Sequence, residues 1–176
     1  IESVGESIVD GIVSPLFYYC FFGPAGAIAY RIVNTMDSMV GYKDKYNIDL
    51  GWMSARADPI LNFIPARLSA ILIILAAGII GADWRNSIHV LSTDHSKTSS
   101  VNAGYPMSTM AGALRVKLEK IGEYTLGIEL EQITIDKCKT AIKIMQVTAL
   151  IFCILISLPI VATLSLMGWW NLIFGF

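Results

Sequence analysis

The stretch IMQVTALIFCILISLPIVATLSLM, residues 144–167, contains no charged side chain. As an α-helix it would be about 36 Å long, more than the roughly 30 Å hydrocarbon core of a bilayer. The composition agrees, because 55% of the residues are hydrophobic and 15% are charged, whereas soluble domains carry about 25% charged residues. We therefore predict that residues 144–167 cross a membrane as a helix.

Two further apolar segments precede this helix. Residues 11–33 are interrupted by Gly23 and Pro24, which predicts a kinked span or two half-helices. Residues 60–82 contain Arg67, so they form either a short span or a re-entrant segment. The predicted fold is all-α: one polytopic integral membrane domain over residues 1–176, in the cell membrane, with about three apolar segments. Because the chain starts at Ile1 without an initiator Met, we expect further N-terminal membrane segments in a longer protein.

The polar segment 83–139 is basic near the final span, which predicts a cytoplasmic loop. Its first part, residues 83–106, has turn-forming residues and little periodicity, and we expect a loop there. Beyond it, apolar residues recur at helical spacing, with charged residues on the opposite side. The apolar set is Met107, Met110, Ala111, Leu114, Leu118 and Ile121, and the charged set is Arg115, Glu119 and Lys120. This pattern predicts an amphipathic interfacial helix that lies on the membrane surface or against the spans.

Several classes of function are disfavoured. The net charge of −1 argues against nucleic acid as a partner, since phosphate backbones require a concentrated basic surface. The sequence contains neither a P-loop nor a dinucleotide-binding fingerprint. His89 and His95 are six residues apart in the polar segment, a spacing typical of no metal site, and we expect both to be solvated.

Polar residues beside the apolar segments are the candidate functional residues, because a charge at mid-membrane costs about 2.5–3.5 kcal/mol and needs a partner. Glu2, Glu6 and Asp10 are spaced i, i+4, i+8, which on a helix gives a stripe of carboxylates. Such oxygen ligands suit Mg²⁺, with phosphate oxygens completing its shell. A solvated helix face is the alternative.

A second group follows the first apolar segment. Arg31, Asn34, Thr35 and Ser38 share a helix face, with Asp37 beside them and Tyr42 and Lys43 beyond. An arginine with amide and hydroxyl donors suits a phosphate or a carboxylate. The alternative is an internal ion pair between Arg31 and an acid.

A third group surrounds the start of residues 60–82. It comprises Arg56, Asp58, Asn62 and Arg67, with Pro59 and Pro65 expected to limit the helix to short pieces. The two arginines would hold an anion, or Arg67 would only snorkel to the membrane interface. A fourth group, Asn102 to Pro106, is a turn that includes Tyr105.

At these four places the sequence resembles the adenosylcobinamide-phosphate synthases, the CobD/CbiB membrane proteins of cobalamin biosynthesis. The matching stretches are ESVGE at residues 2–6 with VDG at 9–11, YRIVNTMDSMVGYK at 30–43, Ala55-Arg56 with Asp58 and NFIPARL at 62–68, and NAGYP at 102–106 with AGAL at 111–114. The resemblance covers residues 2 to about 127. Ser7, Pro59, Phe63 and Tyr105 depart from the usual family residues, which puts a role for position 7 in doubt.

The resemblance implies an ATP-dependent ligase that joins aminopropanol, or its phosphate, to adenosylcobyric acid through an amide bond. ATP and Mg²⁺ would be required, the corrinoid would be a substrate, and an N-terminal portion of the protein or other corrinoid-pathway enzymes would be partners. The implied catalytic residues are Glu6, Asp10, Asp37 and Asp58, and Mg²⁺ would be bound by Glu2, Glu6 and Asp10. The implied substrate-binding residues are Arg31, Asn34, Ser38, Tyr42, Lys43, Arg56, Asn62, Arg67, Asn102 and Tyr105.

Two alternatives stay open. One is a non-catalytic membrane sensor or regulator of the AmpE type, and the other is a corrinoid-binding or transport protein. For the ligase, the ATP-facing loop around Asn102 must share one site with the groups around Asp37 and Asp58. That requires the Gly23-Pro24 break or residues 60–82 to fold back within the membrane.

Overall fold

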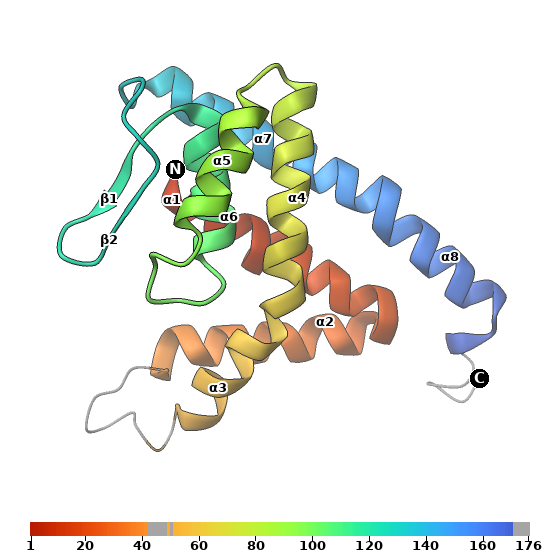
Figure 1. Cartoon of the computed structure of the whole chain (residues 1–176). Coiled ribbons are helices and arrows are strands. Elements are labelled where there is room, and N and C mark those ends of the chain that lie inside the picture. Colours follow the sequence, from red (N-terminus) through yellow and green to blue (C-terminus); the bar gives the residue numbers. More distant parts are fainter. Residues whose placement is uncertain (42–48, 50, 171–176) are drawn as a thin grey trace.

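The computed structural model describes residues 1–41, 49 and 51–170. The fold is predominantly helical, which confirms that part of the prediction (Figure 1). The helices are α1 (Glu2–Ser7), the π-helical η1 (Ile8–Val13), α2 (Ser14–Val40), α3 (Trp52–Leu61), α4 (Phe63–Ile79), α5 (Trp84–Asp94), α6 (Gly104–Leu114), α7 (Ile135–Phe152), the π-helical η2 (Cys153–Ser157) and α8 (Leu158–Leu166). An antiparallel ribbon of β1 (Leu118–Lys120) and β2 (Tyr124–Leu126) makes the all-α prediction incomplete.

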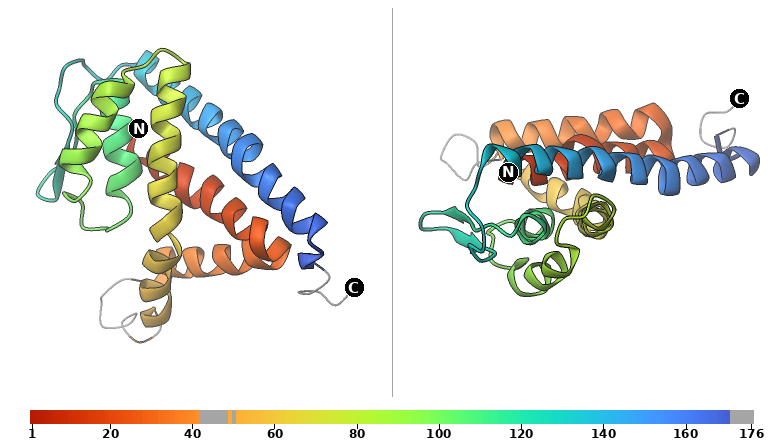
Figure 2. Two further views of the ribbon diagram at one scale, coloured as in Figure 1. Left: turned by 45° about the vertical axis from the view of Figure 1, so that its right-hand side comes forward. Right: turned by 90° about the horizontal axis from the view of Figure 1, so that it is seen from above.

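The first apolar segment is a helical hairpin. Gly23 has φ 60° and ψ −155°, a conformation that glycine adopts readily because it has no Cβ. Pro24 starts the second arm. The arms then run back past each other, so the rings of Tyr18 and Tyr30 stack with centroids 5.5 Å apart (Figures 1 and 2). The arms fit closely at Gly26, where a Cβ would lie 2.6 Å from Phe22 Cβ. Residues 11–33 are therefore two half-helices that double back at Gly23.

A bend of 42° at Asn62 separates α3 from α4. Pro65 does not shorten α4, because it falls in the first turn, where backbone N–H groups have no intrahelical acceptor. One face of α4 is buried through Ala66, Ala70, Ile73 and Ala77. Small side chains on this face let α6 and α7 pack close to α4.

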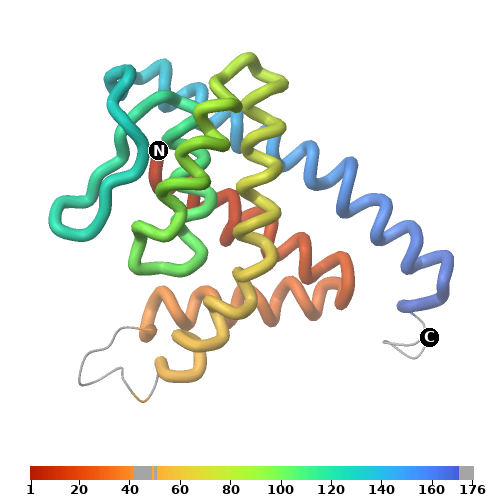
Figure 3. Tube along the Cα trace, in the orientation of Figure 1, coloured from red at the N-terminus to blue at the C-terminus, as the bar shows by residue number. Residues whose placement is uncertain are grey.

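The C-terminal helix runs without interruption from α7 through η2 to α8 and extends away from α4, α5 and α6 (Figure 3). Its first part is buried through Ala141, Ile144 and Phe152. No residue of η2 or α8 is buried, but both contact α2, where Cys20 Sγ lies 3.2 Å from Ser157 Oγ. By length and composition, residues 135–166 are able to cross a membrane, as is the helical stretch 2–40 that doubles back at Gly23, and the bent pair α3–α4 would make a third candidate span.

The predicted amphipathic helix is present in part: α6 carries Met107, Met110, Ala111 and Leu114 and packs against α4, which is the second of the two predicted placements. Its predicted continuation is wrong, because Arg115 adopts the left-handed conformation (φ 60°) and ends α6 at Leu114, and Leu118 begins the ribbon. Every residue of α6 except Tyr105 is buried. Burial of the polar residue Thr109 leaves no unpaired group, because its hydroxyl donates to the main-chain oxygen of Tyr105 within the helix, at 2.6 Å.

The predicted loop at residues 83–106 also needs correction, since α5 occupies Trp84–Asp94. Its contact with α6 depends on Gly112, where a Cβ would lie 2.7 Å from the Asn86 main-chain oxygen. Ser87 Oγ donates to the main-chain oxygen of Thr109 at 2.7 Å. The interface uses small and polar side chains. The buried positions of α5 are Ser87, Val90 and Asp94, of which only Val90 is apolar, so the packed face of α5 is not a continuous apolar stripe.

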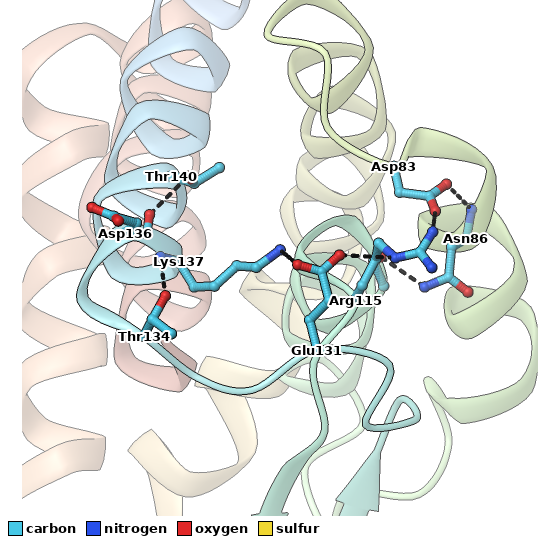
Figure 4. Close-up of polar contacts among 9 residues, drawn as sticks. Asp83, Asn86, Arg115, Glu131, Thr134, Asp136, Lys137 and Thr140 are labelled. Atoms are coloured by element: carbon cyan, nitrogen blue, oxygen red, sulfur yellow. Dashed lines mark hydrogen bonds and ion pairs between the residues drawn. The ribbon is translucent and has the colours of Figure 1, made fainter.

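A network of ion pairs joins α5, α6 and α7 (Figure 4). Arg115 Nη1 lies 2.7 Å from Asp83 Oδ2, and Arg115 Nε lies 3.0 Å from Glu131 Oε1. Glu131 also pairs with Lys137, in the first turn of α7. The network therefore fixes the segment between the ribbon and α7 against the end of α6.

Asp83 caps α5, and we expect its replacement to destabilise the protein in a pH-dependent way. A hydrogen bond from the main-chain N–H of Asn86 is the main cause that holds the pKa of Asp83 below its ordinary value, and the hydrogen bond and charge of Arg115 lower it further. A carboxyl with a lowered pKa stabilises the fold above its unfolded pKa, and this contribution is lost as pH falls through the lowered value. Asp83→Ala should cost about 1 kcal/mol near neutral pH through loss of the cap, and the difference from wild type should shrink below about pH 4.

Thermal unfolding of the detergent-purified protein at both pH values measures this difference. Asp83→Asn is the matched control, because an asparagine retains the capping acceptor and loses only the charge facing Arg115. A pH-independent loss in Asp83→Ala would contradict the assigned role.

Candidate functional site

The bend between α3 and α4 carries a buried amide. Asn62 is 3% exposed. Its Oδ1 accepts hydrogen bonds from two residues of the hairpin, Ser14 Oγ at 2.6 Å and Tyr30 Oη at 2.9 Å. Its Nδ2 donates to both carboxylate oxygens of Asp58, at 3.2 and 3.1 Å. The amide therefore links the hairpin to α3.

Asp58 and the second arm of the hairpin are linked in the same way. Asn34 Nδ2 donates to Asp58 Oδ1 at 3.1 Å, and Asn34 Oδ1 accepts from Arg31 Nη1 at 3.3 Å. Arg31 Nη1 also reaches the main-chain oxygen of Asp10 at 3.1 Å. No ion pair of Arg31 is found among the described residues, so its exposed guanidinium keeps its full charge at this edge.

These residues border a cavity of about 210 Å³ between the hairpin, α3 and the loop before α6. Four carboxylates and three amides line it, from stretches far apart in the sequence. Its lining residues are Glu6, Val9, Asp10, Asn34, Asp37, Ser38, Asp58, Asn62, Ser100, Asn102, Ala103 and Pro106. We call it the acidic cavity. It brings together residues from all four groups that the sequence singled out.

The charge of the acidic cavity determines what it is able to bind. No lysine or arginine is among its lining residues, so an anion entering alone would meet only like charges. In a medium of low polarity such repulsion is strong. The cavity therefore suits a cation, an amine, or a phosphate that enters together with a cation.

The donor chemistry fits Mg²⁺, because carboxylate and amide oxygens are the hard ligands it prefers. Within the described residues, however, no group of three or more His, Cys, Asp or Glu side chains is close enough to hold a metal ion. Asp10 and Asp58 would hold the cation through a few oxygens, and water or phosphate would complete its shell.

Beside the acidic cavity, Arg67 is fixed to the loop before α6. Its Nη1 donates to Asn102 Oδ1 at 3.3 Å and to the main-chain oxygen of Phe63 at 2.6 Å. The guanidinium carbon lies 3.5 Å from the ring centroid of Phe63 and 4.3 Å from that of Tyr105. Asn102 Nδ2 donates to the main-chain oxygen of Pro59 at 2.8 Å. Arg67 and Asn102 thereby join α4, α3 and the polar segment.

Of the predicted site residues that the structure describes, Glu2 and Arg56 lie apart from the acidic cavity. Glu2 lies near Tyr124 of the ribbon. Burial, and after it the negative charge of Glu2, raises the pKa of Tyr124 to about 12. Arg56 is exposed, 4.7 Å from the Trp52 ring centroid. Tyr42 and Lys43 lie outside the described residues.

Three residues that hold the site together are not among the predicted site residues. Tyr30 and Ser14 bind Asn62, and Ser100 Oγ accepts from the main-chain N–H of Ala103 at 3.2 Å. Tyr30 directly precedes Arg31, yet its partner Asn62 is 32 residues away in sequence. Only the packing of the hairpin against the bend reveals this pair.

A family model described as CobD/Cbib protein matches residues 1–167. The chain belongs to the CobD/CbiB family. This finding confirms the family resemblance, and the acidic cavity is therefore a feature of a CobD/CbiB chain.

Curated relatives agree with this membership. The chain is 43% identical to the probable cobalamin biosynthesis protein CobD of Methanothermobacter thermautotrophicus, over 86% of the chain and 51% of that protein. It is 52% identical to the cobalamin biosynthesis protein CobD of Dehalococcoides mccartyi, over 74% and 42%. The chain spans about half the length of the relatives it matches. No solved structure matches it.

We expect Asn62→Leu to destabilise this CobD/CbiB chain strongly. The change leaves the Ser14 hydroxyl without its acceptor, leaves the Tyr30 hydroxyl only the longer hydrogen bond to Asp10 Oδ1 at 3.4 Å, and takes two hydrogen bonds from Asp58. Each unsatisfied buried group costs about 1–3 kcal/mol. Asn34→Leu is the comparison, because it removes one hydrogen bond to Asp58 from a half-exposed position. Thermal unfolding in detergent measures both. Equal losses in the two variants would show that Asn62 is not the central residue.

Proposed function

We propose that the full-length protein is an ATP-dependent acid–amine ligase of cobalamin biosynthesis, which joins aminopropanol or aminopropanol phosphate to adenosylcobyric acid. Its family and the names of its relatives, which are cobalamin biosynthesis proteins, support this role. The observation that carries the proposal is the convergence of four separate sequence stretches on one acidic cavity.

The reaction defines what the site must do. A carboxylate does not condense with an amine in water, so a phosphoryl group passes from ATP to a carboxylate oxygen and ADP leaves. The amine nitrogen then attacks the carbonyl carbon, phosphate departs with the C–O electron pair, and the nitrogen loses a proton. When bound, Mg²⁺ would neutralise phosphate charge during these steps.

Side chains of the acidic cavity suit the amine half of this reaction. Carboxylates attract an ammonium group and accept the proton it must lose before it attacks. Asp58 is held by the amides of Asn34 and Asn62, so it provides a fixed negative charge. Asp37 also lines the acidic cavity, and no hydrogen bond to its carboxylate is found among the described residues. We assign Asp37 as the group that accepts the proton and Asp58 as the group that orients the amine.

Arg31 suits the acid half. Its exposed guanidinium lies next to Asn34 and the Asp10 main chain. Paired N–H donors bind carboxylate and phosphate groups well. Arg31 would hold the activated acid at the edge of the acidic cavity while the amine occupies the interior.

Mass spectrometry of reaction products tests the proposal directly. Detergent-purified full-length protein is incubated with adenosylcobyric acid, ATP and Mg²⁺, together with aminopropanol or aminopropanol phosphate. We expect a product whose mass equals the two substrates less one water, and ADP in equal amount. Corrinoid binding without product would instead support a binding or transport protein.

We also expect Glu6→Gln to raise the Mg²⁺ concentration needed for half-maximal rate several-fold and to leave corrinoid binding unchanged. Glu6 is an exposed carboxylate on the lining of the acidic cavity, and its removal takes away one negative charge that attracts the cation. Glu129→Gln is the matched control, because Glu129 is exposed and does not line this cavity. An unchanged Mg²⁺ dependence in Glu6→Gln would remove Glu6 from the cation site.

A further inference from the structure

A second cavity, of about 230 Å³, lies beside the acidic cavity and has the opposite chemistry. Arg67, His95, Thr98, Ser100 and Tyr105 are among its lining residues, and none of the residues that line it is a carboxylate. The two cavities share Ser100. We call the second one the donor cavity, because its side chains are rich in N–H and O–H groups.

Arg67 supplies the positive charge of the donor cavity. It is half-buried between the rings of Phe63 and Tyr105 and forms no ion pair within the part of the chain that the structure describes. Both of its hydrogen bonds use Nη1. Its Nε and Nη2 hydrogens meet no acceptor among the described residues, so they are available to a ligand.

Ser100 adds a further donor and His95 an acceptor. His95 Nδ1 lies 2.9 Å from the main-chain oxygen of Leu91, which is only able to accept, so Nδ1 carries the hydrogen and the lone pair of Nε2 in the neutral ring is an acceptor. A singly protonated phosphate would donate its O–H to Nε2. Ser100 Oγ accepts from the N–H groups of Asn102 and Ala103, which leaves its own hydrogen free to donate.

The loop that carries these groups is fixed in place. Gly104 lies so close to it that a Cβ would be 1.9 Å from the His95 main-chain oxygen and 2.8 Å from Thr98 Oγ1. Thr98 Oγ1 in turn donates to the main-chain oxygen of Ser100 at 2.8 Å. The donor groups are therefore held in position before any ligand arrives, which lowers the cost of binding.

We propose that the donor cavity binds a phosphate monoester through Arg67, His95 and Ser100. The proposal rests on the proposed function and deepens it. A molecule with an ammonium group and a phosphate group would place the ammonium among the carboxylates of the acidic cavity and the phosphate beside Arg67. Aminopropanol phosphate has this composition, and the phosphate chain of ATP is the other source of the same group.

Titration of the detergent-purified full-length protein with inorganic phosphate, followed by calorimetry, tests the site without turnover. We expect wild-type binding, and a loss of roughly tenfold in affinity in Arg67→Lys, because lysine lacks the paired donors of arginine. His95→Gln should also weaken binding. Arg85→Lys is the matched control, since Arg85 likewise lies over an aromatic ring, Trp84, but lines neither cavity. Absence of binding in wild type, or wild-type affinity in both site variants, would overturn the proposal.

Steady-state kinetics identifies the source of the phosphate. In Arg67→Lys, a raised KM for aminopropanol phosphate with an unchanged KM for aminopropanol would assign the donor cavity to the amine substrate. A raised KM for ATP alone in the same variant would assign the cavity to the nucleotide. Unchanged KM values for both would overturn the site even if inorganic phosphate bound. Because the titration needs no catalysis, a failure of the donor cavity to bind phosphate is distinguishable from a failure to observe the ligase reaction.

Discussion

The side-chain amide of Asn62 satisfies polar groups from three parts of the chain at the point where α3 meets α4. Buried hydroxyls and carboxylates depend on such partners, because each unpaired group carries a desolvation cost. Ser14 and Tyr30 belong to different arms of the hairpin, and both donate to the same oxygen. The hairpin therefore cannot shift against the bend without leaving a polar group unpaired. The shape of the acidic cavity follows from this constraint.

The two cavities lie side by side with opposite charge, and a neutral amide lies between them. Asn102 lines the acidic cavity and accepts a hydrogen bond from Arg67, which lines the donor cavity. Asn102 gives Arg67 a neutral acceptor, and no ion pair of Arg67 is found in the described part of the chain. Each charge then remains available to a ligand, at the cost of charges left partly uncompensated.

Sequence reasoning found the polar groups of the site because they stand out against apolar surroundings. It also found the break at Gly23 and Pro24, since both residues disrupt a helix by their own backbone properties. The prediction of a loop was wrong at α5, and α6 ends earlier than the apolar spacing beyond Leu114 had suggested. The interface between α5 and α6 uses Gly112, Ser87 and Thr109, and such small or polar residues are also common in loops. His95 was predicted to be solvated, because nothing in the sequence indicates that its loop folds back on Gly104. Arrangements of this kind depend on contacts between segments and have no local signature.

The reversal at Gly23 has a consequence for topology. A segment that enters a bilayer and doubles back leaves on the side from which it came, so a hairpin of residues 2–40 placed in a bilayer would add no net crossing. Glu6 and Asp37, near the two ends of the hairpin, would then face the same aqueous compartment in either orientation of the protein. A single straight span over the same residues would have put them on opposite sides of the bilayer, and no shared pool of water-soluble substrate could have reached both.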